Sequence, residues 1–302
     1  PIFAKMKQAS KPSTWSIAKK VFIWIFIIHM GWFLFFIWQK FSETDFVVAN
    51  LKNKMMLLLS IIAAIVLLYI FVLKKIMLIK KTAILLREVF FILYISTFLY
   101  TVIGMVFNPL ITFTQVGSLL QGYGLHRDYI SYDAMGPNIK LAVIASEDQL
   151  YTDHDGFDLK AIKRALKYNK KHPNKIRGAS TISQQTAKNI FLFQGGGFLR
   201  KGPEVFFTFT IETIWTKRMI LERYLNCIEM GPGIFGVQAA AKTYFNKNAR
   251  ALSRTEAAQI AACLPNPKRI NARGSYALNR AGDIVRQMGF LEPDPDIQDL
   301  IK

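Results

Sequence analysis

Three apolar segments near the start of this 302-residue chain constrain its fold most strongly. They span residues 21–38, 55–73 and 89–107 and contain no Asp, Glu, Lys or Arg. At 1.5 Å of rise per residue, a helix of each length crosses the ~30 Å hydrocarbon core of a bilayer. We therefore predict an N-terminal membrane region over residues 1–108 with three candidate transmembrane helices.

The first apolar segment follows a basic stretch, as the apolar core of a signal peptide does. It is longer and more aromatic than such a core, and no small-residue cleavage site follows it, so we expect it to be retained as an anchor. An alternative is that the first two segments form a hairpin that does not span the bilayer. In both cases the chain after the third segment lies on the same side of the membrane.

Charged residues predict the orientation. The net charge is +10 over residues 1–108 and +9 over residues 109–302. Lys and Arg concentrate in residues 1–20 and in the loop 74–88, and cytoplasmic loops are enriched in these residues. Three crossings then place residues 109–302 outside the cytoplasm. The charge of that domain favours an anionic partner such as a phosphorylated substrate, and the outside placement argues against nucleic acid.

Beyond Asn108 the pattern is mostly α-helical, with no convincing series of strands. Residues 110–120 are apolar and are expected at the membrane interface. Residues 194–197 are expected to form a glycine loop. The two cysteines are expected to be buried. Caps and periodicity predict helices at 141–150, after Asp158, after Thr181 with Gln184 as capping box, at 203–215, after Thr216 as far as Gly231, at 236–245, and after Ser253 with Glu256 as capping box.

Candidate site residues follow in two groups. Glu147 and Asp148 open a stretch of acids that also holds His154, although adjacent acids before a helix are usually only solvated. The stretch 178–185 is a hydroxyl-rich helix start, which is either an anion site or an ordinary capped helix. Cations follow at Lys188 and at the pair Arg200 and Lys201, where a solvated basic turn is the alternative. The glycines of 231–236 match a dinucleotide fingerprint but follow a helical pattern, so we interpret them as a helix–helix turn.

Together these segments resemble the peptidoglycan glycosyltransferase domain (glycosyltransferase family 51), in its monofunctional, membrane-anchored form. Tyr151 stands where the family often has Phe. Members of this type usually have one membrane anchor, whereas this chain has two further apolar segments. No transpeptidase domain is expected after the fifth motif segment. The five motif segments occur in family order at residues 147–158, 178–189, 200–212, 217–245 and 252–265.

The resemblance implies a mostly α, lysozyme-like domain over residues 109–302. It also implies polymerisation of lipid II, with inversion at the anomeric carbon and release of undecaprenyl pyrophosphate. An inverting displacement needs one base, which is Glu147 here. Glu204 matches a second family carboxylate, which orients the basic cluster, holds a divalent ion or supports the substrate. The pyrophosphate and sugars are expected to contact Ser180, Thr181, Gln184, Lys188, Arg200 and Lys201.

No ligand set for a resident metal is evident, and a divalent ion (Mg or Mn) at the pyrophosphate is the one cofactor compatible with this chemistry. The expected partners are lipid II, the growing glycan strand, the bilayer, and proteins of cell division or elongation. The expected location is the bacterial cytoplasmic (inner) membrane, with the catalytic domain on the periplasmic side. Two alternatives stay open: a lysozyme-like hydrolase or lytic transglycosylase with Glu147 as general acid, and an inactive membrane scaffold of the cell-wall machinery.

Overall fold

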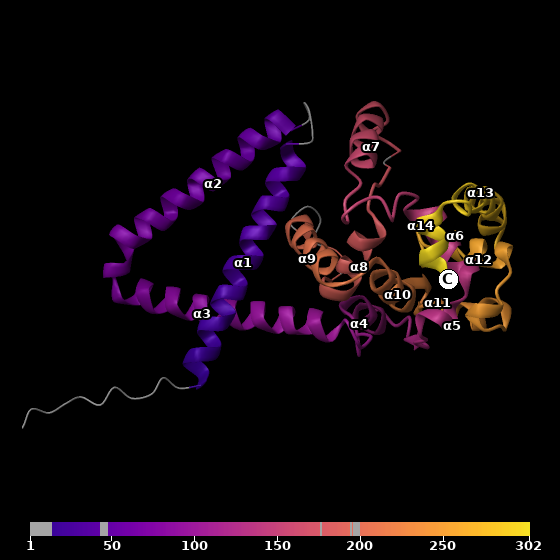
Figure 1. Ribbon diagram of the computed structural model, residues 1–302, viewed down its shortest axis with the longest axis horizontal. Helices are drawn as coiled ribbons and strands as arrows, with labels where there is room; N and C mark the ends of the chain where they lie inside the picture. The colour runs from indigo at the N-terminus through magenta and orange to yellow at the C-terminus, as the bar shows by residue number, and fades with distance from the viewer. Residues whose placement is uncertain (1–13, 43–47, 176, 194, 196–199) are drawn as a thin grey trace, which may run out of the picture. The chain divides into compact units, whose positions relative to one another are not determined.

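The computed structural model describes residues 14–42, 48–175, 177–193, 195 and 200–302. Of the predicted glycine loop, only Gly195 is among them. The chain forms two compact units, residues 1–97 and 98–302 (Figure 1). The elements are α1 (Thr14–Ser42), α2 (Val48–Phe71), η1 (Leu73–Lys75), α3 (Met77–Ile103), α4 (Phe113–Leu120), β1 (His126–Arg127), α5 (Tyr132–Met135), α6 (Pro137–Glu147), α7 (Leu159–Lys171), α8 (Ile182–Phe191), α9 (Lys201–Ile214), α10 (Lys217–Cys227), β2 (Glu229–Gly231), β3 (Ile234–Phe235), α11 (Val237–Phe245), η3 (Ala249–Ala251), α12 (Arg254–Ala261), α13 (Ser275–Leu291) and α14 (Pro295–Ile301).

Helices α1 and α3 pack against each other in the first unit. The Phe26 ring meets the Tyr94 ring edge to face at 4.9 Å, and His29 Nδ1 lies 2.9 Å from the Tyr94 hydroxyl. Among the described residues, Ala18–Lys40 and Met77–Ile103 are long and apolar enough to cross a membrane, by length and composition alone. The second predicted segment contributes the shorter apolar stretch Leu59–Phe71 within α2.

The last residues of α3 belong to the second unit, so the division at 97/98 falls earlier in the chain than the expected boundary at residue 108. Trp215 Nε1 donates to the Thr101 carbonyl at 2.8 Å, and Arg223 Nε donates to the Gly104 carbonyl at 3.0 Å. These bonds satisfy carbonyls at the helix end, which have no partner inside the helix. The hydrophobic pattern could not reveal them.

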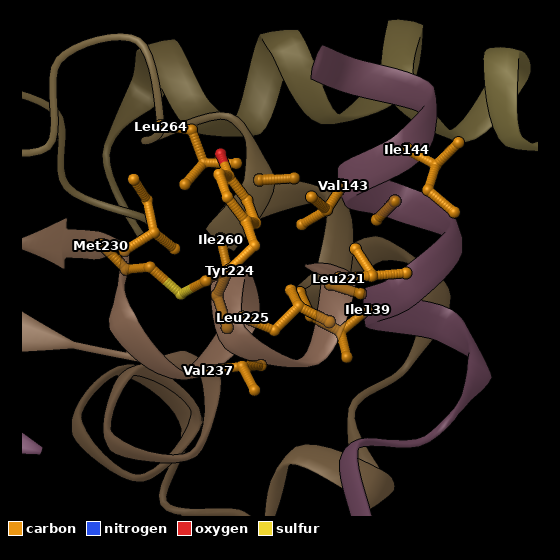
Figure 2. Close-up of a cluster of buried hydrophobic side chains, with 14 of the residues drawn as sticks. Ile139, Val143, Ile144, Leu221, Tyr224, Leu225, Met230, Val237, Ile260 and Leu264 are labelled. Carbon is orange, nitrogen blue, oxygen red and sulfur yellow. The ribbon is translucent and has the colours of Figure 1, made fainter. Parts of the chain in front are cut away.

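The core of the second unit is built around α6, whose residues from Ile139 to Ala145 are all buried. A helix that is buried on every side is expected at the centre of a helical domain. It packs against α12 and α13, while α8 packs against α9 and α10. Figure 2 shows Ile139 and Val143 of α6 in one cluster with Leu221 and Leu225 of α10. The core therefore holds α6 and α10 together.

The helix starts predicted after Asp158, Thr181, Thr216 and Ser253 are confirmed. The Asp158 side chain accepts from the Ala161 N–H at 2.7 Å, and Thr216 caps α10. Capping boxes at Thr181 and Ser253 are both complete. The two cysteines are free and buried, as expected.

The helix expected at 141–150 begins earlier, at Pro137, and ends at Glu147, because a proline is favoured in the first turn and Glu147 is where the buried run reaches the surface. The helix expected from Pro203 begins two residues earlier, at Lys201.

The expected helix as far as Gly231 is wrong, because α10 ends at Cys227 and strand β2 follows. Strand β3 pairs antiparallel to β2 and parallel to β1, giving the order β1-β3-β2. The glycine pattern is therefore a β-hairpin turn rather than a helix–helix turn. Gly233 has φ +69°, and a Cβ there would lie 2.1 Å from the Tyr123 carbonyl oxygen, so only glycine fits. Strands of two or three residues are too short to show an alternating pattern.

Candidate active site

Glu147 is the last residue of α6, where the buried helix reaches the surface. Its Oε2 accepts from Gln185 Nε2 of α8 at 2.8 Å, and its Oε1 accepts from the Ser146 hydroxyl at 3.1 Å. Burial raises the pKa of the Glu147 carboxyl above its ordinary value, and the two hydrogen bonds oppose that rise. A carboxylate with a raised pKa and fixed orientation suits proton transfer near neutral pH.

Asp148 ties the end of α6 to the start of α8. Its Oδ2 accepts from the Ile182 N–H at 2.9 Å, and its Oδ1 lies 2.9 Å from His154 Nε2. His154 Nδ1 accepts from the Gly156 N–H, so its Nε2 carries the proton and donates to Asp148. Asp148 therefore caps the first turn of α8 from another helix and fixes Glu147 beside it.

A second set of buried polar contacts supports the same turn. Thr181 Oγ1 donates to the Gly156 carbonyl at 2.7 Å, and Ser183 Oγ donates to Glu212 Oε1. Lys217 Nζ donates to Glu212 Oε1 at 2.8 Å and to the His154 carbonyl at 2.6 Å. The acidic stretch after Glu147 thus serves mainly to position the N-terminus of α8.

Glu147 opens into a cleft of about 820 Å³. The facing wall is the start of α8, with Ser180, Thr181 and Gln185, and Arg280 of α13 also lines it. This volume falls within the usual range for ligand pockets. The cleft combines the half-buried Glu147 carboxylate with the start of α8 and three guanidinium groups, those of Arg164, Arg177 and Arg280. This is a suitable environment for an anionic substrate with a reacting hydroxyl.

A cluster of charged residues follows along α8 and α9. Lys201 Nζ lies 2.5 Å from Glu204 Oε1, and Arg200 Nε lies 3.8 Å from Glu204 Oε2. Lys188 is half-buried, and its pKa is lowered by burial and then by the charge of Arg200, while Glu204 and Glu147 oppose this. Arg200 Nε and Glu204 Oε2 are buried without a hydrogen-bond partner in the part of the chain described.

The structure brings the predicted site residues into two neighbouring groups. Glu147, Ser180 and Thr181 line the cleft, and the four residues Lys188, Arg200, Lys201 and Glu204 form the adjacent cluster. Gln184 is absent from the cleft lining, because its amide completes the cap of α8 and its side chain is buried. No group of three or more His, Cys, Asp or Glu side chains suited to a metal occurs within the described ranges.

Sequence reasoning missed two residues that touch or face Glu147. Gln185 bonds both Glu147 and the Tyr224 hydroxyl, and only the helical phase of α8 distinguishes it from Gln184. Arg280 lies beyond the fifth motif segment, and its charge acts on the pKa of Glu147. No pattern in the sequence pointed to Arg280, because the packing of α13 against α6 brings it to the cleft.

Comparison with known proteins agrees with the resemblance found in the sequence. A family model described as Transglycosylase matches residues 114–289. A "Biosynthetic peptidoglycan transglycosylase" of Escherichia coli is 47% identical over 205 residues, which is 66% of this chain and 85% of the relative. One of Citrobacter koseri is 49% identical over 195 residues, with 63% and 81% coverage.

The chain therefore belongs to the transglycosylase family. It is a peptidoglycan glycosyltransferase, an enzyme of cell-wall synthesis that polymerises glycan strands. The resemblance and the mostly α, lysozyme-like fold expected from the sequence are confirmed.

Replacing Arg280 with Gln is expected to move the acid limb of the pH–activity profile to higher pH. The Arg280 charge lowers the pKa of Glu147, so its removal raises that pKa further. A base must be deprotonated, and activity is therefore lost as the pH falls through this pKa. The measurement is kcat/KM for lipid II against pH.

Arg286→Gln, an exposed substitution on the same helix, is the matched control and should leave the limb unchanged. If the acid limb of the pH–activity profile of Arg280→Gln lay at the wild-type pH, Arg280 would not influence the pKa of Glu147.

Proposed function

We propose that lipid II is polymerised in this cleft with Glu147 as the general base. Glu147 takes the proton of the acceptor 4-hydroxyl as that oxygen bonds to the anomeric carbon of the donor. The bond from that carbon to the pyrophosphate breaks, and undecaprenyl pyrophosphate leaves. The observation that carries the proposal is the half-buried Glu147 carboxylate, whose pKa is raised by burial and whose Oε2 accepts from Gln185 Nε2 at 2.8 Å beside the N-terminus of α8.

The charged cluster along α8 and α9 is proposed to bind the pyrophosphate. A phosphate leaving group needs cations and N–H donors for its developing charge, rather than a carboxylic acid. Lys188, Arg200 and Lys201 supply the cations, and Arg200 Nε, which has no hydrogen-bond partner among the described residues, offers a donor to a ligand. Thr181 and Ser180 line the cleft at the start of α8, where the positive end of the helix dipole favours an anion.

Glu204 is proposed to orient this cluster, since both of its carboxylate oxygens face cations. A divalent ion is also compatible with it. Mg²⁺ commonly takes one protein carboxylate together with substrate phosphates, and Glu204 Oε2 is buried without a hydrogen-bond partner among the described residues. Such an ion would neutralise phosphate charge.

The catalytic domain is proposed to lie at the outer face of the cytoplasmic membrane, where a polyprenyl substrate is reached from the bilayer. Helix α4 supports a membrane contact, because it buries its polar residues Thr114, Gln115 and Ser118. Its apolar residues point the other way, and Phe113 and Leu120 are exposed together with Leu110. An exposed apolar patch of this kind is typical of an interaction surface. The outside placement rests on the Lys and Arg distribution of the loops.

The test is incubation of the purified full-length protein with labelled lipid II in detergent, with and without divalent metal. Glycan strands are the expected product. A raised pKa at Glu147 would equally suit the general acid of a hydrolase, so preformed glycan is offered in a parallel reaction. Cleavage of that glycan in place of polymerisation would establish the hydrolase, and a folded protein with neither activity would establish the scaffold.

A further inference from the structure

Helix α7 is unlike the other long helices of the second unit, because none of its residues is buried. Figure 1 shows it standing out beyond α8. Its apolar residues Leu159, Ile162 and Leu166 recur at helical spacing, and Leu166 is 51% exposed. An amphipathic helix of a soluble domain normally buries its apolar stripe. Here the stripe is only partly covered.

Every charged residue in α7 is basic. Six of its thirteen residues are Lys or Arg: Lys160, Lys163, Arg164, Lys167, Lys170 and Lys171. Arg164 lies 3.6 Å from Asp158, whereas the five lysines form no ion pair within the part of the chain that the structure describes. Arg177 stacks on the Tyr168 ring at 3.7 Å and extends the same basic surface. The positive charge of this surface is therefore left for an external partner.

The combination of a partly exposed apolar stripe and a dense basic face is typical of helices that lie in a membrane interface. A purely acidic protein or glycan partner would account for the lysines but not for the exposed leucine. Ala161 and Arg164 of α7 also line the cleft that contains Glu147, so this helix forms part of the cleft's rim. A surface that receives a lipid-linked pyrophosphate must come close to lipid headgroups.

We propose that α7 docks on anionic phospholipid headgroups, and that this holds the rim of the cleft at the bilayer surface. The lysines contact headgroup phosphates, and Leu166 with Ile162 enters the boundary of the acyl chains. The role of the rim in substrate entry rests on the proposed function above, whereas the docking itself does not.

The experiment uses full-length protein in nanodiscs of phosphatidylcholine, with or without phosphatidylglycerol, and no substrate. Leu166→Cys carries an environment-sensitive fluorophore, and both native cysteines are buried and so spared. A blue shift of the emission is expected with phosphatidylglycerol and not with phosphatidylcholine alone, and salt should reduce it. Because no substrate is present, the result is independent of whether the chain polymerises lipid II.

The decisive variant replaces three lysines of α7 with Gln: Lys163, Lys167 and Lys170. These lysines lie on one face of the helix and outside the cleft lining. Each lysine near an anionic leaflet changes the docking equilibrium by roughly fivefold, so about a hundredfold loss is expected for three. The control removes three exposed charges elsewhere, by Arg273→Gln, Arg286→Gln and Lys302→Gln, and should keep the shift. An unfolding midpoint in detergent equal to that of wild type verifies the fold of the triple lysine variant.

Equal emission in the two lipids would overturn the proposal, and so would a shift that survives in the triple lysine variant. A shift produced by added glycan with free peptide carboxylates, regardless of lipid, would instead assign the surface to the product strand.

Discussion

Replacing Glu147 with Gln is expected to reduce polymerisation of lipid II by at least about 100-fold, the scale for loss of a general base. Glutamine has nearly the same shape and can still accept a hydrogen bond from Gln185, so the cleft should keep its form. It cannot take a proton from the acceptor hydroxyl. The loss should therefore appear in kcat, with little change in the binding of lipid II.

The measurement is the initial rate of glycan formation by wild type and variant at equal concentration. Asp153→Asn is the matched control, since it removes a carboxylate that is exposed in the same segment and does not line the cleft. It should leave the rate near wild type. Glycan formation by Glu147→Gln at a rate close to wild type would remove Glu147 as the base, whatever its pKa.

Replacing Asp148 with Ala is expected to give the largest loss of stability in the site, roughly 3 kcal/mol or more. The carboxylate is buried and accepts from the Ile182 N–H and from His154 Nε2, both at 2.9 Å. Alanine leaves both donors buried without a partner, and each such loss costs about 1–3 kcal/mol. Asp148→Asn keeps one acceptor oxygen, so its stability should lie between that of the wild type and that of Asp148→Ala.

The measurement is the free energy of unfolding of the catalytic unit within the full-length protein in detergent, from denaturant titrations. Asp299→Asn, at an exposed position of α14, is the control and should change little. Equal stability of Asp148→Ala and wild type would mean that Asp148 does not hold the start of α8. Activity should fall with stability, because the same contacts place Gln185 against Glu147.

Most helix starts in the second unit could be predicted from the sequence, because a cap is a local interaction. Thr181 with Gln184 and Ser253 with Glu256 each satisfy N–H groups within one turn, so four residues suffice to recognise them. The short strands could not be predicted. Their pairing joins Glu229 to Phe235 across a glycine turn and His126 to Ile234 across more than a hundred residues.

The sequence by itself determined the order of the motif segments, the apolar N-terminal helices, the family and Glu147 as the candidate base. These depend on residue type and spacing along the chain, which the sequence records directly. Only the tertiary structure decided which glutamine of α8 meets Glu147, that Arg280 faces it, and that Asp148 caps a helix other than its own. Those relations depend on how α6, α8 and α13 pack against one another. Packing fixes which side of each helix faces the cleft, and a shift of one residue along the helix would turn a different side chain toward Glu147.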